Sequence, residues 1–281
     1  MTRITLAVCL IVAIVTIGII GSLIVIHMLK NDDETPVPIP LKPEPEYTVV
    51  RKIRAVTIGA NRVDPSAYDG WEGKLPDCEY DATKAADLWK SYGIPTITLL
   101  TENATRNKCY EALKKSISEL QTGDLLIVWI SGHGGQMPDY SGDETDQLDE
   151  YVCAYDGAVT DDTINEWLSE VPKGICILWI CDTCHSGTMY KVLPPVFNQK
   201  AVSNFKGQLI LISGCAEDSY SVSTGRGGVL SNALQNVSPK NKSPKKWFEE
   251  AIKLIPKETQ QPEYHEYGNV NDDFRYGIIV E

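Results

Sequence analysis

Apolar residues in this chain gather in short runs that alternate with amphipathic stretches. The runs are largely apolar on both faces, which is typical of buried strands, and they cover Arg54–Gly59, Thr96–Leu100, Asp124–Ser131, Gly174–Cys181 and Gly207–Ser213. The stretches show helical spacing or helix-start residues, which predicts helices at Asp77–Tyr92, Thr105–Leu120, Asp161–Val171, Val229–Gln235 and Pro244–Ile255. This alternation predicts an α/β fold, with a mainly parallel sheet of about six strands and helices on both faces.

One apolar run is much longer than the others and begins near the N-terminus. It extends from Ile4 to Leu29 without a charged residue. A helix of these 26 residues would span about 39 Å, more than the ~30 Å hydrocarbon core of a bilayer. A cleaved secretory signal has a shorter apolar region and a small-residue cleavage site, and no such site follows this run. We therefore expect residues 4–29 to be a retained, single-pass transmembrane anchor.

The segment after this run separates it from the rest of the chain. Residues 31–46 are acidic and contain five prolines, a composition typical of a stiff, extended spacer. We expect residues 47–281 to form one folded domain beyond it.

Charge and cysteine content limit the partners and the compartment of this domain. Without residues 1–30 the chain carries 24 basic and 38 acidic residues. Such a surface repels phosphate backbones, so we expect no nucleic-acid partner and a better match to basic peptides or cations. Seven cysteines remain, and an odd number without the spacing of a disulfide framework favours a reducing compartment. We therefore expect the domain on the cytosolic side of the membrane.

Two of the predicted strands end in loops with unusual chemistry. One continues into Ser-Gly-His-Gly-Gly at residues 131–135, and another into Asp-Thr-Cys-His-Ser-Gly at residues 182–187. The carboxyl ends of parallel strands meet at one edge of a sheet, where functional loops collect. We therefore expect His133 and Cys184 to lie side by side.

A cysteine beside a histidine can act as a nucleophile. A thiol with a pKa of about 8.5 is mostly protonated at neutral pH, and a neighbouring imidazole can accept its proton or lower its pKa. The imidazole can then protonate a leaving amine. The backbone N–H groups of Gly134 and Cys184 are candidates for stabilising a tetrahedral oxyanion. The pair predicts acyl transfer, with Cys184 as nucleophile and His133 as acid/base partner.

Other interpretations of these loops remain open. Taken singly, a histidine in a glycine-rich loop and a cysteine after a strand are usually structural. Residues 181–185 also fit the C-x-x-C-H pattern of haem attachment and contain the C-x-x-C pattern of a redox dithiol. Haem attachment requires an exposed Cys181, whereas the end of an apolar strand predicts a buried one. We expect no organic cofactor, and no further ligands stand out that would complete a structural zinc site.

The two loops resemble the motifs of the metacaspases, cysteine peptidases with a caspase fold. The family's histidine motif, Y/F-S-G-H-G, is similar to residues 130–134, and its cysteine motif, D-x-C-H-S-G, matches residues 182–187 throughout. Weaker similarity extends over about residues 51–281 and includes an acidic loop at 142–150. The resemblance implies that residues 47–281 form a caspase-like peptidase domain of the type I arrangement, which acts as a cysteine endopeptidase.

The resemblance also implies cleavage after basic residues. Asp182 and Asp81 match the acidic residues of the family's substrate pocket (S1), to which we also assign Ser131. Two carboxylates in a partly closed pocket select Arg or Lys, with Arg favoured for its bidentate geometry. The alternative for Asp81 is an exposed acid on a helix surface.

Calcium activation is common in metacaspases, and the matching acids here are Asp149, Asp161 and Asp162. Three carboxylates with backbone oxygens can hold a hard cation. Lys191 replaces the family's fourth acid, which places a positive charge near the implied site. The alternative is that the two adjacent aspartates cap a helix.

Two functions of other classes compete with the endopeptidase. A caspase-fold chain that has lost efficient catalysis would be an interaction module at the membrane, and Lys191 is the feature in its favour. A thiol redox protein would use Cys181 and Cys184.

Overall fold

The computed structural model describes residues 51–142, 147–183, 205–214 and 225–281. The chain divides into two units, residues 1–45 and 46–281, and the fold below belongs to the second. The expected anchor at 4–29 and spacer at 31–46 lie outside the described residues. Within the described ranges, no helix is long and apolar enough to cross a membrane.

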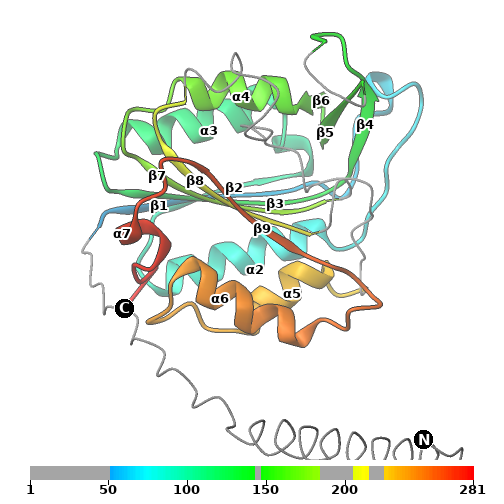
Figure 1. The fold of residues 1–281 in the computed structure, drawn as a ribbon. Helices are drawn as coiled ribbons and strands as arrows, with labels where there is room; N and C mark the ends of the chain where they lie inside the picture. The colour runs from blue at the N-terminus through cyan, green and yellow to red at the C-terminus, as the bar shows by residue number, and fades with distance from the viewer. Residues whose placement is uncertain (1–50, 143–146, 184–204, 215–224) are drawn as a thin grey trace, which may run out of the picture. The chain divides into compact units, whose positions relative to one another are not determined.

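A six-stranded sheet forms the centre of the domain (Figure 1). Its strands, in spatial order, are β2 (Thr96–Leu100), β1 (Ile53–Gly59), β3 (Leu125–Ser131), β7 (Cys176–Asp182), β8 (Gln208–Ser213) and β9 (Glu263–Gly268). Neighbouring strands are parallel except β9, which runs antiparallel to β8. Every residue of β3, β7 and β8 is buried, as expected for strands covered on both faces. The predicted α/β fold with a mainly parallel sheet is confirmed.

Helices cover both faces of this sheet. Figure 1 shows α3 (Arg106–Ser118) and α4 (Asp161–Ser169) on one face, and α2 (Cys78–Ser91), α5 (Val229–Gln235) and α6 (Pro244–Ala251) on the other. The second group packs around fully buried tryptophans, with ring centroids 5.7 Å apart for Trp89 and Trp247 and 6.2 Å apart for Trp129 and Trp247. α2 approaches β1 closely because residue 59 is glycine, where a Cβ would overlap the backbone of Cys78.

The structure contains elements that the sequence pattern did not predict. A second sheet of three antiparallel strands follows His133 and consists of β4 (Gly134–Pro138), β5 (Leu148–Ala154) and β6 (Gly157–Thr160). Part of this region was interpreted as an acidic loop. β9 was also missed, because Glu-Tyr-His-Glu-Tyr-Gly is polar, which suits an edge strand. The helix predicted to end at Ile255 ends at Ala251 and continues as a 3-10 turn to Leu254, and a short helix, α7 (Asp272–Arg275), follows β9.

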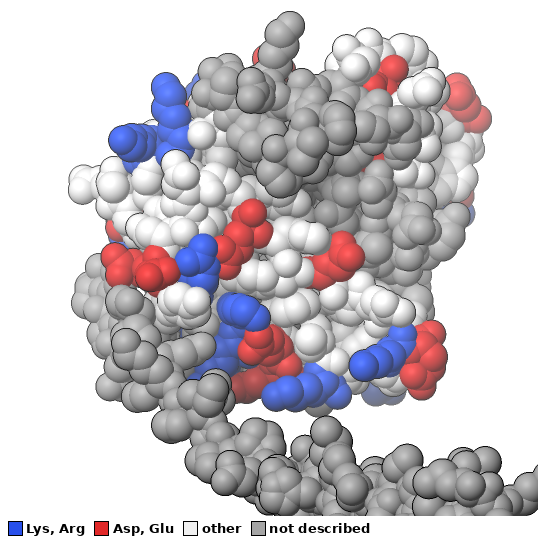
Figure 2. Space-filling model, in the orientation of Figure 1, with Lys and Arg blue, Asp and Glu red and all other residues white. Residues whose placement is uncertain are grey.

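The surface around α7 and β9 carries charges of both signs. Figure 2 shows Lys and Arg side chains beside Asp and Glu side chains on this face. Arg275 forms ion pairs with Glu266 at 2.7 Å and with Asp272 at 2.9 Å. Surface pairs of this kind contribute only about 0–1 kcal/mol each, so the fold depends mainly on its buried layers.

Candidate active site

The candidate site lies at the carboxyl edge of the central sheet, where β3 and β7 end. Ser131, the last residue of β3, is the register partner of Gly59 in β1 and of Asp182 in β7. The loops that carry His133 and Cys184 therefore start at neighbouring positions on one edge, as the parallel arrangement predicted. Cys184 lies outside the described residues, so its assignment as nucleophile stays a prediction.

His133 is half-buried beside the loop that connects β1 to α2. Its imidazole lies against the indole of Trp71, with ring centroids 4.7 Å apart, and makes a hydrogen bond with the backbone of Gly73. Burial lowers the pKa of His133, and the Gly73 bond offsets part of this effect. Within the described residues, Nε2 has no hydrogen-bond partner. The loop thus holds an imidazole that is neutral at physiological pH, with one ring nitrogen available for chemistry.

Two buried carboxylates lie beside Ser131. Asp81, in the first turn of α2, has no exposed surface, and Asp182 is 4% exposed. The hydroxyl of Ser131 donates to Asp81 Oδ2 at 2.7 Å. The alternative interpretation of Asp81 as an exposed helix acid is wrong, because it lies on the buried side of α2. The structure brings together the three residues predicted for the substrate pocket.

The N-terminal end of α5 contacts both carboxylates. Gly228 N–H donates to Asp81 Oδ2 at 2.9 Å, and Ser231 N–H donates to Asp182 Oδ2 at 2.8 Å. A Cβ at residue 228 would overlap the Asp182 carboxylate, and a Cβ at residue 227 would overlap that of Asp81. Gly227 and Gly228 are therefore needed for this close approach. They were not predicted as site residues, although the Gly-Arg-Gly-Gly run at 225–228 ahead of a predicted helix was a signal.

The environment of Asp81 raises its pKa to about 7. Burial is the main cause, and the negative charges of Asp182 and Asp77 add to it, whereas the hydrogen bonds from Gly228 and Ser131 act in the opposite direction. Oδ1 of Asp81 is buried and has no hydrogen-bond partner among the described residues. A cation at this oxygen would favour the ionised carboxylate and satisfy the oxygen at the same time.

The described cysteines are poorly suited to redox or haem chemistry. Cys181 has no exposed surface, and its sulfur lies 3.3 Å from the hydroxyl of Thr183. The exposure that haem attachment requires is therefore missing, as the strand pattern predicted. Burial raises the pKa of three other thiols, to about 12 for Cys78, about 12 for Cys109 and about 11 for Cys176. These thiols stay protonated at neutral pH and are unreactive.

Two of the three predicted calcium ligands are buried. Asp149 in β5 is 5% exposed, and Asp161 at the start of α4 is 2% exposed, while the adjacent Asp162 is half-buried. The N-cap of α4 is Thr160, whose hydroxyl accepts a backbone N–H of the first turn at 3.3 Å, so the alternative of an aspartate cap is wrong. Among the residues that the structure describes, no group of three or more His, Cys, Asp or Glu side chains is arranged to hold a metal ion.

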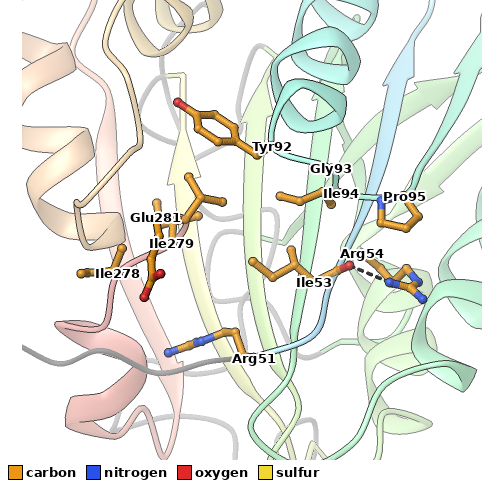
Figure 3. A pocket seen from close by; sticks show the side chains of 11 residues that line it. Arg51, Ile53, Arg54, Tyr92, Gly93, Ile94, Pro95, Ile278, Ile279 and Glu281 are labelled. Atoms are coloured by element: carbon orange, nitrogen blue, oxygen red, sulfur yellow. Dashed lines mark hydrogen bonds between the residues drawn. The ribbon is translucent and has the colours of Figure 1, made fainter.

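A pocket of about 410 Å³ opens at the opposite end of the sheet (Figure 3). Its lining comes from the start of β1, the loop before β2 and the C-terminus, and includes Arg51, Tyr92 and Ile279. β1 begins at this end and finishes at Gly59, beside Ser131. The pocket is therefore separate from the candidate site, which is identified by its chemistry rather than by cavity size.

Comparison with known proteins places the chain in a family. The family described as Caspase domain matches residues 54–269. Metacaspase-1 of Pyricularia oryzae is 32% identical over 166 residues, which are 54% of this chain and 40% of that protein. Metacaspase-2 of Arabidopsis thaliana is 28% identical over 202 residues, which are 61% of this chain and 47% of that protein. The matched region thus spans less than half the length of these relatives.

Solved structures share the fold. A protein from Geobacter sulfurreducens superimposes with a TM-score of 0.71 at 29% sequence identity, covering 82% of this chain and 100% of that chain. Caspase-1 from Spodoptera frugiperda gives a TM-score of 0.51 at 11% identity over 78% of this chain and 86% of that chain, which shows the shared fold. The family match covers most of this chain and includes both loops of the candidate site, so the chain belongs to the caspase domain family and is similar to its metacaspase members.

Proposed function

We propose that this chain is a cysteine endopeptidase that cleaves proteins after Arg or Lys, with Cys184 as nucleophile and His133 as acid/base partner. The caspase domain family supports the reaction class. The specificity rests on one observation, the buried pair of Asp81 and Asp182, in which one oxygen of Asp81 has no partner among the described residues.

The reaction follows from the chemistry of a thiol and an imidazole. Neutral His133 accepts the proton of the Cys184 thiol, and the thiolate attacks the carbonyl carbon of the scissile bond. The resulting oxyanion accepts hydrogen bonds from the N–H groups of Gly134 and Cys184. His133 returns the proton to the leaving amine as the C–N bond breaks, and water then hydrolyses the thioester. The lowered pKa of His133 supports the first step, because it keeps the imidazole neutral at physiological pH.

The acid pair explains why a basic side chain would be selected. Two carboxylates held out of water lose much of their hydration, and a guanidinium can restore charge balance through two parallel hydrogen bonds. Ser131 and the N–H of Gly228 already occupy Oδ2 of Asp81, which leaves Oδ1, buried against Gly227, as the oxygen without a partner among the described residues. An acidic substrate side chain would add a third negative charge, and we expect it to be refused.

Calcium activation is a second proposal about this site. The buried carboxylates of Asp149 and Asp161 support it, because buried negative charge favours a nearby cation. These two residues and Asp162 would hold the ion together with backbone oxygens, although their side chains are not grouped as a metal site in the described structure. Lys191 opposes binding through its own positive charge.

The location of the enzyme is also a proposal. The uncharged run from Ile4 to Leu29 supports a single-pass membrane anchor, and the odd number of cysteines after it supports a domain that faces the cytosol. The acidic spacer at residues 31–46 would separate the two.

Loss of either dyad residue should abolish proteolysis. We expect Cys184→Ala and His133→Ala each to lower kcat/KM for an internally quenched Arg peptide by roughly 10³-fold or more, with unchanged circular dichroism. Cys181→Ala should keep substantial activity, whereas a redox dithiol would lose its function. Full activity in either dyad variant would refute the assignment, and an interaction module without catalysis would cut no peptide at all.

The ionisation of Asp81 should be visible in substrate binding. Because its pKa is about 7, the carboxylate gains charge as the pH rises through that value, and we expect KM for Arg peptides to fall between about pH 6 and pH 8. Asp81→Asn should remove this dependence and cost little at pH 6, where wild-type Asp81 is largely protonated. Asp182→Asn should cost more, about tenfold or greater, at both pH values. Steady-state kinetics with matched Arg and Asp peptides would test this, and efficient turnover of the Asp peptide would contradict it.

Calcium should raise activity only at millimolar concentration. If Lys191 folds back as the family's fourth acid would, about 6 Å from a divalent ion, their repulsion would amount to a few kcal/mol at an effective dielectric near 20. Lys191→Asp should therefore lower the midpoint of activation by about tenfold or more, as read from a calcium titration of peptide cleavage. If a chelator does not affect activity and Lys191→Asp changes nothing, the acids have no role in calcium binding.

The full chain should partition into membranes. After a high-salt wash we expect the full chain in the membrane pellet, because about 39 Å of apolar helix would be buried there. A fragment that begins at Tyr47 should remain in the supernatant. Recovery of the full chain in the salt-washed soluble fraction would rule out the anchor.

A further inference from the structure

Trp71 combines exposure with direct contact to the proposed acid/base residue. Its side chain is 47% exposed, although it is large and apolar. The same indole packs on the imidazole of His133, with ring centroids 4.7 Å apart and planes tilted by 54°. The exposed part of the ring therefore offers an apolar surface next to the atoms of the proposed reaction.

The loop that carries Trp71 is held firmly in place. Tyr68 donates its hydroxyl proton to Ala154 O at 2.7 Å, and its ring packs edge-on against Trp71 at 6.0 Å. Val63 N–H donates to Glu72 O at 3.0 Å, which closes the loop on itself. The indole contacts the backbone of residue 73 so closely that a Cβ there would lie 3.0 Å from the ring. The ring thus has a defined position before any substrate binds.

The acid pair and the Trp71 loop are bonded to elements on opposite faces of the central sheet, and His133 follows the end of β3, at the edge of that sheet. Asp81 and Asp182 contact α5, on the face of the sheet that α2, α5 and α6 cover. The Trp71 loop is bonded to the end of β5, in the second sheet, which Figure 1 shows on the side of α3 and α4. A peptide whose basic side chain reaches the acid pair would therefore cross His133 towards Trp71.

The reaction itself places the next residue beside this ring. To protonate the leaving amine, the imidazole must come within about 3 Å of the amine nitrogen. The side chain of the residue after the scissile bond (P1′) is joined to that nitrogen through a single carbon. It therefore emerges next to the imidazole, within reach of an indole whose centroid is 4.7 Å from the imidazole ring.

We infer that Trp71 forms the P1′ subsite and that it favours an aromatic or aliphatic residue immediately after the scissile bond. This inference rests on the proposed peptidase function and extends it beyond the basic residue before the bond. Aromatic pairs contribute about 0.5–1.5 kcal/mol beyond the area that they bury, which is enough for a measurable preference.

The test uses the full chain in detergent and internally quenched peptides that differ only at P1′. With Arg before the bond, we expect kcat/KM for P1′ Phe or Leu to exceed that for P1′ Gly by about tenfold. Trp71→Ala should reduce this ratio to about twofold or less, and Trp71→Phe should keep most of it. Tyr140→Ala, which removes an aromatic ring that is 82% exposed, should leave the ratio unchanged. A loss common to all peptides would reflect displaced His133, so only the ratio reports the subsite.

Two results would overturn the inference: a wild-type enzyme without a P1′ preference, or a preference that survives in Trp71→Ala. Binding to the Cys184→Ala variant decides the matter even if no peptide is cut. There the P1′ Phe peptide should bind several-fold more tightly than the P1′ Gly peptide, and the additional Trp71→Ala change should remove the difference. Absence of Cys184-dependent cleavage would reject the proposed function, whereas equal affinities of the two peptides would reject the subsite.

Discussion

The parallel pairing of β3 with β7 is the constraint on which the candidate site depends. It fixes Ser131 opposite Asp182, and every functional loop leaves the sheet from these positions or from their neighbours. Side chains alternate between the two faces of a strand, so a shift of one residue in this register would move Asp182 away from α5 and Ser131 away from Asp81. Each strand also places a large tryptophan in a different layer of the core, Trp129 among the residues of one face and Trp179 among those of the other, and a shift of one residue would move both rings out of these layers. The stability of the core and the geometry of the site therefore have the same origin.

The acid pair shows how the fold tolerates buried charge. A carboxylate removed from water costs several kcal/mol unless hydrogen bonds replace its hydration. Backbone N–H groups of α5 provide such bonds to both aspartates, and glycines at 227 and 228 allow the backbone to come close enough. The compensation is incomplete for Asp81, whose pKa is raised to about 7. The remaining electrostatic cost is what a basic substrate would relieve, so the proposed preference for basic side chains rests on this incomplete solvation.

The sequence predicted those strands and helices that are determined by the residues within them. The strands around residues 53–59, 125–131 and 176–182 are recognisable because each is a short, largely apolar run. Their parallel order then places the starts of the two motif loops at one edge of the sheet. The second sheet escaped prediction because pairing between its strands, rather than an apolar pattern along each strand, defines it. Trp71 and Gly228 act through contacts with residues distant in the sequence, and no spacing rule connects them to His133 or Asp182. Contacts of this kind depend on the tertiary structure and cannot be predicted from the spacing of residues along the chain.

Burial shifts the two titrating groups of the site in opposite directions, but both shifts favour the same pH range. The pKa of His133 is lowered, so its neutral form persists to lower pH, while the pKa of Asp81 is raised, so its charged form requires a pH above about 7. The folded state holds the Asp81 proton more tightly than the unfolded chain does. The stability from this group is therefore complete below about pH 4 and is lost as the pH rises through about 7. Above about pH 7, Asp81 therefore carries the charge that would attract a basic substrate, but it no longer stabilises the folded state. Binding of a guanidinium would offset this loss of stability.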